Sequence, residues 1–139
     1  MYQTIVITFF CIVITIIDIK TYRIPDILLL IFFFTVIIMQ GYQPYTHLIV
    51  KFSSSVITML LFSAVWFYSR GIGLGDVKYA ALLGYLLTPE KLIYTFISAA
   101  ILCVIIYMIG VVLFRWSKIT KIPFAPFLSA GVILALTVN

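Results

Sequence analysis

Residues 91–114 read KLIYTFISAAILCVIIYMIGVVLF, with Lys91 as the only charged residue of the run. A helix of about 20 apolar residues can cross the hydrocarbon core of a bilayer, which is about 30 Å thick. The run therefore predicts a membrane helix, and shorter apolar runs elsewhere bring the expected number of helices to six. Their expected ranges are 3–18, 26–40, 49–68, 76–88, 91–114 and 121–138.

The composition of the whole chain agrees with a membrane fold. Of its 139 residues, 65% are hydrophobic and 9% are charged, and the mean hydropathy is +1.27. Soluble domains carry about 25% charged residues, so this chain has too little polar surface to fold as a globule in water. We expect an all-α membrane protein, a bundle of about six transmembrane helices in the lipid bilayer, forming one integral-membrane domain over residues 1–139.

The basic residues predict the orientation of this bundle. Lys and Arg favour the cytoplasmic side of a membrane, and seven of the nine fall in or beside the first, third and fifth loops. These loops are therefore expected to be cytoplasmic and both termini external, in the plasma membrane. Nucleic acid is not an expected partner, because no Lys/Arg-rich run is present. The seven residues are Lys20, Arg23, Arg70, Lys78, Arg115, Lys118 and Lys121.

Two acidic residues on this cytoplasmic face are candidates for catalysis. Asp18 ends the first apolar run, where an unpaired carboxylate is costly and suggests function. Asp76 follows the glycines of GIGLGDVK (71–78) at the start of the fourth helix, where the helix dipole favours an acid. Two carboxylates about 3 Å apart share a proton, and such a pair can activate a water and protonate a leaving amine. We expect Asp18 and Asp76 to act together, the protons belonging to the pair.

The glycine-rich segment also predicts close packing. Glycines at alternate positions allow unusual backbone angles and the close approach of another chain. Asp76, Ala80 and Gly84 lie on one helical stripe, whose small residues allow a neighbouring helix to pack against it. Lys78 is two residues on from Asp76, so it is expected to point elsewhere, toward the membrane interface.

Other interpretations of these acids remain open. Basic residues of the first loop could neutralise Asp18, and Asp76 could be no more than a helix cap. Asp26 is the rival for the second carboxylate. Because it follows Pro25, and Pro-Asp is ordinary chemistry at a helix start, we interpret Asp26 as a helix-start residue.

Few other chemistries fit the sequence. The single histidine, His47, is expected on the membrane face opposite the aspartates, which excludes a Ser-His-Asp set. Cys11 and Cys103 occur singly in apolar runs and are interpreted as small buried hydrophobic residues. No spacing typical of metal ligands is present, so neither a metal nor another cofactor is expected. The glycine-rich segment lacks the spacing of a phosphate-binding P-loop.

Three segments resemble those of the type IV prepilin peptidases, membrane aspartic peptidases that include the preflagellin peptidases. They are DIKTYRIPD (18–26), GLGDVK (73–78) and KIPFAPFL (121–128). The family shows an aspartate before an Ile-Pro-Asn-like turn, then G-x-G-D-x-K, then an I-P-F-G-P-F-like segment. Asp26 stands where the family often has Asn, and Ala125 where it often has Gly. Neither difference removes a catalytic carboxylate.

The resemblance implies that Asp18 and Asp76 are the catalytic pair. It implies as substrates prepilin-like or pseudopilin precursors, whose basic leader peptide is cut at the cytoplasmic face, commonly after Gly. Longer members carry an N-terminal domain with paired cysteines that is linked to N-methylation. This chain starts at the peptidase core, so we expect no N-methyltransferase activity. Roles in loop support or substrate binding are expected for Gly73, Gly75, Lys78 and Pro25.

Two alternative functions are compatible with the composition. One is a non-enzymatic membrane transport or assembly subunit with proton-binding or packing aspartates. A scaffold, however, does not require a glycine-rich turn before Asp76 with Asp18 at matching depth. The other is a relative of the presenilin-like proteases, which share a G-x-G-D turn and cut inside a substrate helix. The first and third segments favour the prepilin peptidase type.

Overall fold

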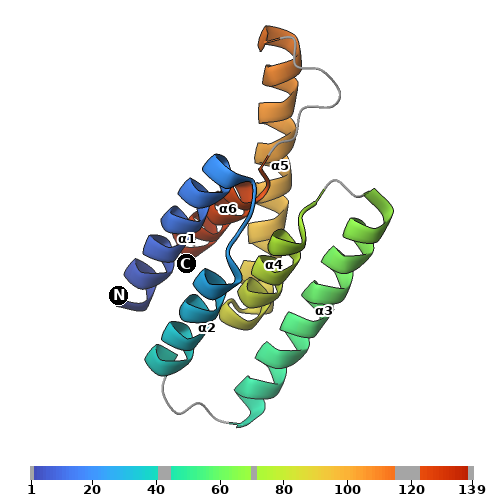
Figure 1. Ribbon diagram of the computed structural model, residues 1–139. Helices are drawn as coiled ribbons and strands as arrows, with labels where there is room; N and C mark the ends of the chain where they lie inside the picture. The colour runs from blue at the N-terminus through green and yellow to red at the C-terminus, as the bar shows by residue number, and fades with distance from the viewer. Residues whose placement is uncertain (1, 41–44, 70–71, 115–122, 138–139) are drawn as a thin grey trace.

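The computed structural model describes residues 2–40, 45–69, 72–114 and 123–137, and all regular structure within these ranges is helical (Figure 1). The prediction of an all-α bundle with six helices is confirmed. Gly71 and several residues of the predicted basic loops, including 115–121, lie outside the described residues. The helices are α1 Tyr2–Thr21, α2 Asp26–Gln40, α3 Tyr45–Ser69, α4 Leu74–Leu86, α5 Pro89–Phe114 and α6 Ala125–Thr137.

The end of α1 differs from the prediction. Asp18 was expected to be its last residue, but the helix continues to Thr21, so Asp18 lies in its last turn. Tyr22, the residue after the helix, has a positive φ of 52°, and its N–H donates to the Asp18 carbonyl oxygen at 2.8 Å. This is an αL end, usually made by glycine. Pro25 follows and restricts the residue before it to extended backbone.

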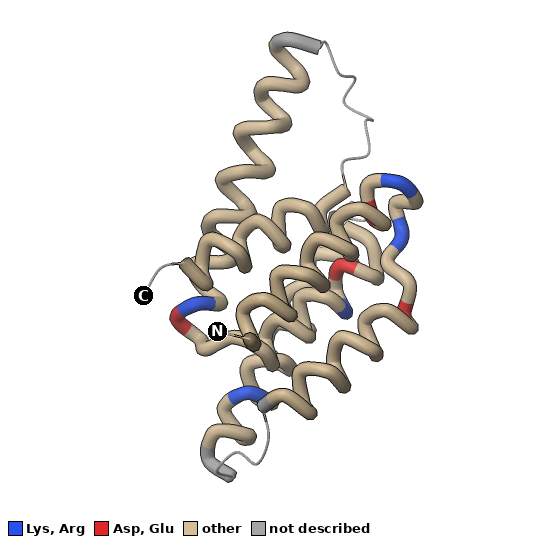
Figure 2. The backbone as a smooth tube through the Cα atoms, turned by 90° about the vertical axis from the view of Figure 1, so that its left-hand side faces the viewer, with Lys and Arg blue, Asp and Glu red and all other residues tan. Residues whose placement is uncertain are grey.

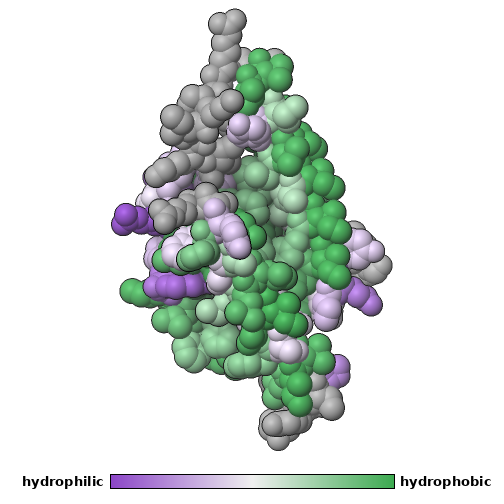
Figure 3. Space-filling model, turned by 90° about the vertical axis from the view of Figure 1, so that its right-hand side faces the viewer, coloured by the Kyte–Doolittle hydropathy of each residue, from purple (hydrophilic) through white to green (hydrophobic). Residues whose placement is uncertain are grey.

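Three helices are long and apolar enough to cross a membrane, within Tyr2–Thr21, His47–Tyr68 and Pro89–Val112. The remaining helices are shorter, with 15 residues in α2 and 13 each in α4 and α6. Hydrophobic side chains cover most of the described part of the face drawn in Figure 3. The charged residues gather in two groups toward opposite ends of the bundle (Figure 2). The chain is therefore a helical membrane protein with charged ends and an apolar middle.

The short helix α4 lies at the centre of the bundle. It packs against α3 and α2, whereas α6 packs against α1 and α5 (Figure 1). The ring of Phe10 in α1 stacks on Phe32 in α2, with 4.6 Å between the ring centroids. The five largest fully buried side chains come from α1, α2, α4 and α6, and α5 adds Leu92 and Ala99 to the buried core. The five are Ile14, Phe32, Tyr79, Leu83 and Leu128.

Two glycines allow the helices to approach closely. A Cβ atom added at Gly84 of α4 would lie 2.9 Å from the Ser54 carbonyl oxygen and from the Cα of Ser55 in α3. A Cβ added at Gly131 of α6 would meet the Thr95 carbonyl oxygen in α5. Small residues at such contacts let helix backbones pack closely in membranes. The predicted close approach at Gly84 is confirmed.

We expect Gly84→Ala to lower the thermal stability of the detergent-solubilised protein. Overpacking costs about 1–3 kcal/mol, more than the gain of about 1 kcal/mol in helix propensity from replacing glycine by alanine. Gly73→Ala is the matched control, because its Cβ would lie 3.4 Å from a side-chain oxygen, which is ordinary contact. Unfolding of both variants at the wild-type temperature would contradict the close contact between α3 and α4 at Gly84.

Candidate active site

One end of the bundle brings together the end of α1 and the starts of α2 and α4. A cavity of about 460 Å³ opens there, and Asp18 and Asp76 both line it. Segments far apart in the sequence contribute to it, including the loop before α2 and the last part of α3. The lining residues are Asp18, Tyr22, Arg23, Ile24, Asp26, Trp66, Gly73, Leu74, Gly75, Asp76 and Lys78.

Asp76 lies in the first turn of α4 and is buried, with 7% of its surface exposed. Its Oδ2 atom accepts a hydrogen bond of 3.2 Å from the backbone N–H of Gly73, the residue before the helix. Asp76 therefore does cap α4, as one of the open interpretations held. Its other oxygen, Oδ1, is also buried and has no hydrogen-bond partner in the described part of the chain. The cap uses one oxygen only.

Asp18 is buried to a similar degree, with 4% of its surface exposed. The backbone N–H of Ala125, the first residue of α6, lies within hydrogen-bonding reach of its carboxylate. Asp18 Oδ2 is buried without a hydrogen-bond partner among the described residues. Ala125 belongs to the third of the sequence segments singled out above. The segment 121–128 thus supplies a backbone donor to the carboxylate of the segment 18–26.

The two carboxylates lie close enough for their charges to interact. Within the described ranges, Asp18 forms no ion pair, although Lys20 and Arg23 are near it in sequence. The interpretation that these basic residues neutralise Asp18 is therefore not supported. Two buried acids share one cavity, and each presents an oxygen that no described protein group occupies. Such an arrangement suits the binding and transfer of protons.

Gly75 allows the loop between α1 and α2 to lie close to the start of α4. A Cβ added at Gly75 would lie 3.1 Å from the Cβ of Ile24, a buried residue of the loop between α1 and α2. This confirms the predicted close approach of another part of the chain. The expected unusual backbone angles are not found at Gly73, which is extended with φ −75° and ψ 151°. Gly73 supports the loop through its N–H instead.

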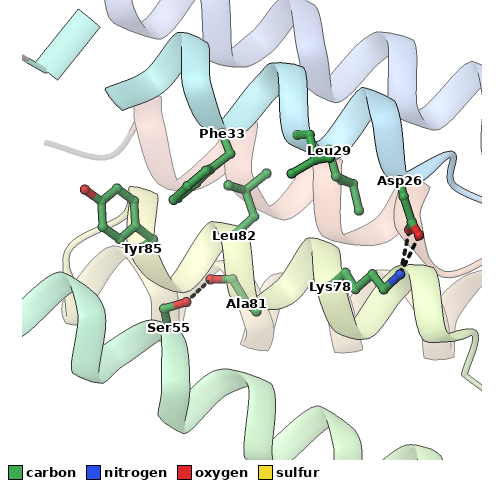
Figure 4. Close-up of a pocket in the computed structure, with 9 residues that line it drawn as sticks. Asp26, Leu29, Phe33, Ser55, Lys78, Ala81, Leu82 and Tyr85 are labelled. Carbon is green, nitrogen blue, oxygen red and sulfur yellow. Dashed lines mark hydrogen bonds and ion pairs between the residues drawn. The ribbon is translucent and has the colours of Figure 1, made fainter. Parts of the chain in front are cut away.

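The third aspartate of this end has a different environment. Asp26 is the first residue of α2, and both its carboxylate oxygens accept hydrogen bonds of 2.7 Å from Lys78 Nζ (Figure 4). The two side chains are 63% and 52% exposed. Lys78 points away from Asp76, as expected, but toward Asp26. Pro25 lies just before α2, and its carbonyl oxygen accepts from the N–H of Leu28 at 3.1 Å.

A buried polar cluster behind the cavity was not foreseen from the sequence. The Tyr79 hydroxyl of α4 donates to Cys11 Sγ of α1 at 3.3 Å and is hydrogen-bonded to Ser129 Oγ of α6 at 3.0 Å. Tyr79 is three residues after Asp76, and Ser129 is four after Ala125. The cluster therefore connects α1, which carries Asp18, with α4, which carries Asp76, and with α6. The expectation that Cys11 is buried is confirmed, but it also has a polar contact.

The other functional candidates lie apart from this site. His47 lines a separate cavity with Leu86 and Thr88, near the start of α3 and the end of α4, and so at the opposite end from Asp76. Cys103 is only partly buried. Within the described ranges, no group of three or more His, Cys, Asp or Glu residues could hold a metal ion.

Comparison with known families shows which family the chain belongs to. The family model described as the type IV leader peptidase family matches residues 5–109, which is most of the chain. The chain belongs to the type IV leader peptidase family. The match includes the segments that carry Asp18 and Asp76 and ends before the segment that carries Ala125. No curated protein and no solved structure matches the chain.

Membership of the type IV leader peptidase family gives the protein a proteolytic function of the leader-peptidase kind. It confirms the predicted family. It also decides against the non-enzymatic transport or assembly subunit as the general description of the chain. The cavity at the start of α4 is therefore the candidate active site of a membrane peptidase.

We expect Tyr79→Phe to destabilise this peptidase by about 1–3 kcal/mol, because it leaves a buried Ser129 hydroxyl without its partner. The measurement is the thermal unfolding midpoint in detergent. Tyr94→Phe is the matched control, since Tyr94 in α5 is exposed. Equal unfolding midpoints for the two variants would contradict the role of the cluster in joining α1, α4 and α6.

Proposed function

We propose that the protein is a membrane aspartic endopeptidase that removes the basic leader from prepilin-like or pseudopilin precursors. One observation carries the proposal. Asp18 and Asp76 are the two buried carboxylates of one cavity, and each retains an oxygen with no partner among the described residues. A scaffold has no need for two such groups side by side, because burying an unpaired charge is costly.

The chemistry follows from two carboxylates that share one proton. The ionised carboxylate takes a proton from a water, whose oxygen forms a bond to the carbonyl carbon of the scissile peptide. The protonated carboxyl then gives its proton to the leaving nitrogen as the C–N bond breaks. The backbone N–H groups of Gly73 and Ala125 hold the two side chains in place through the cycle. The proton belongs to the pair, so neither aspartate has a fixed role.

The proposed orientation places this cavity at the cytoplasmic face. The described basic residues at this end are Lys20, Arg23 and Lys78, and positive residues favour the cytoplasm. A basic leader that stays in the cytoplasm, followed by an apolar helix in the membrane, would pass this end of the bundle. Within this single integral-membrane domain, both termini would then be external.

The test is cleavage of a prepilin-like precursor co-expressed with the protein, with loss of the leader read by mass spectrometry. We expect Asp18→Asn and Asp76→Asn each to lower the rate by about 10² to 10⁴-fold, the contribution typical of a positioned acid or base. Each variant should still be recovered from the membrane fraction in wild-type amounts.

Asp26→Asn is the matched control, because it is the same substitution on an acid at the same end of the bundle. Its exposed ion pair with Lys78 is worth about 0–1 kcal/mol of folding stability, and Asp26 transfers no proton in the proposed reaction, so cleavage should continue at close to the wild-type rate. Normal cleavage by the Asp18 or Asp76 variant would refute the dyad. Loss of cleavage in the Asp26 variant alone would show that the wrong partner had been assigned.

A further inference from the structure

A groove runs along α4 between α2 and α3, beside the candidate active site. Its volume is about 390 Å³. Figure 4 shows Leu29 and Phe33 of α2 facing Leu82 and Tyr85 of α4, with Ser55 of α3 on the other side. The Ser55 hydroxyl donates to the Ala81 carbonyl oxygen at 2.8 Å, so this polar side chain is already satisfied. The groove is therefore apolar along most of its length.

One end of the groove is polar and joins the active-site cavity. Asp26 and Lys78, which form the ion pair, line both the groove and the cavity that contains Asp18 and Asp76. From there the groove extends to Tyr85. Lys78 and Tyr85 are seven positions apart on α4, which corresponds to about 10 Å, or two helical turns. The groove thus leads from the two buried carboxylates into the apolar middle of the bundle.

We infer that this groove binds the first turns of the apolar helix that follows the leader in the substrate, which rests on the function proposed above. A segment entering from the membrane must satisfy its own backbone groups and is therefore helical. Side chains of two helical turns match the length of the groove. At the polar end, beside the Asp26–Lys78 pair, the substrate leaves the helix and passes extended between Asp18 and Asp76. The groove then selects precursors by their apolar helix, and the two aspartates cut the peptide bond that precedes this helix.

The position of Leu30 supports this assignment. It lines the groove from α2, yet 55% of its surface is exposed. The groove is therefore open along its side, which lets a helix already in the bilayer enter laterally. Its continuity with the catalytic cavity favours the substrate over a lipid chain, because a lipid headgroup at Asp26 and Lys78 would stand in the path of the leader.

The first test compares two substrates. One is a precursor with its leader and apolar helix, and the other is a short peptide with the leader and the few residues around the cut. Ala81→Leu adds three carbon atoms to the floor of the groove, and Leu30→Trp enlarges its rim. We expect each variant to lower the ratio of kcat/KM for the precursor to that for the short peptide by about tenfold, mainly through KM.

Ile97→Trp is the matched control. Ile97 is an apolar residue of α5 with 54% exposure and is not part of the groove. It should leave the ratio unchanged. An unchanged ratio in both groove variants would overturn the assignment. Cleavage of the short peptide shows in each case that the variant is folded, so a folding defect cannot imitate the expected result.

The second test does not depend on cleavage. A photo-crosslinking amino acid replaces Leu30 in the Asp76→Asn variant, and the labelled precursor is added in vesicles. We expect a crosslink to the apolar helix of the precursor that excess unlabelled precursor removes and the short peptide does not. Crosslinks to lipid alone would overturn the assignment.

The two tests separate this inference from the function on which it rests. If the wild-type protein cuts neither substrate but the crosslink forms, the groove assignment stands and the proposed function fails. If the protein cuts both substrates with the same ratio in every variant and no crosslink to the precursor forms, the proposed function stands and the groove assignment fails.

Discussion

The structure depends on the burial of two carboxylates in a bundle that offers them few partners. The solution is the same for both. Gly73 immediately precedes α4 and Ala125 is the first residue of α6, and each places a backbone N–H at one aspartate. Helix starts carry N–H groups without intrahelical partners and a partial positive charge, so they stabilise an acid without a basic side chain. Each aspartate keeps one buried oxygen without a hydrogen-bond partner among the described residues.

This solution explains why the bundle contains both long and short helices. A helix start can reach a buried carboxylate only if the helix begins beside it, and α4 and α6, which do so, have 13 residues each. Short helices bury little surface on their own, so they need close neighbours. Gly84 brings α4 against α3, and Gly131 brings α6 against α5. The Tyr79 hydroxyl then joins α4 to α1 and α6.

The sequence predicted the class and the six helices, and it singled out two aspartates that line one cavity, because apolar length, charge and helical spacing are local properties. It did not predict partners that depend on how helices meet. Tyr79 contacts Cys11 and Ser129, which are 68 and 50 residues away, and nothing in a single sequence marks them. The backbone donor at Ala125 was missed for the same reason. Every residue except proline has a backbone N–H, so the residue type alone does not show that Ala125 is a donor to Asp18.

Backbone conformation was also difficult to predict. The glycines before Asp76 suggested unusual angles, yet Gly73 is extended, and the left-handed residue among the described non-glycine positions is Tyr22. Tyr22 adopts this conformation because α1 must end before Pro25 so that Ile24 can reach Gly75. The requirement comes from the meeting of two segments, which no local pattern displays. Gly75 is needed for space and not for its angles.

The three aspartates at this end show how environment assigns different roles to one residue type. Asp26 is exposed, and both its carboxylate oxygens accept hydrogen bonds from Lys78. An acid paired in this way is a poor proton carrier, because both oxygens are already used as acceptors. Asp18 and Asp76 are buried, lie beyond the reach of any described basic partner and interact with each other. Environments that differ in this way separate the roles of carboxylates in acid–base chemistry. The Asp26–Lys78 pair thus holds Lys78, which lines the same cavity, away from the two buried acids.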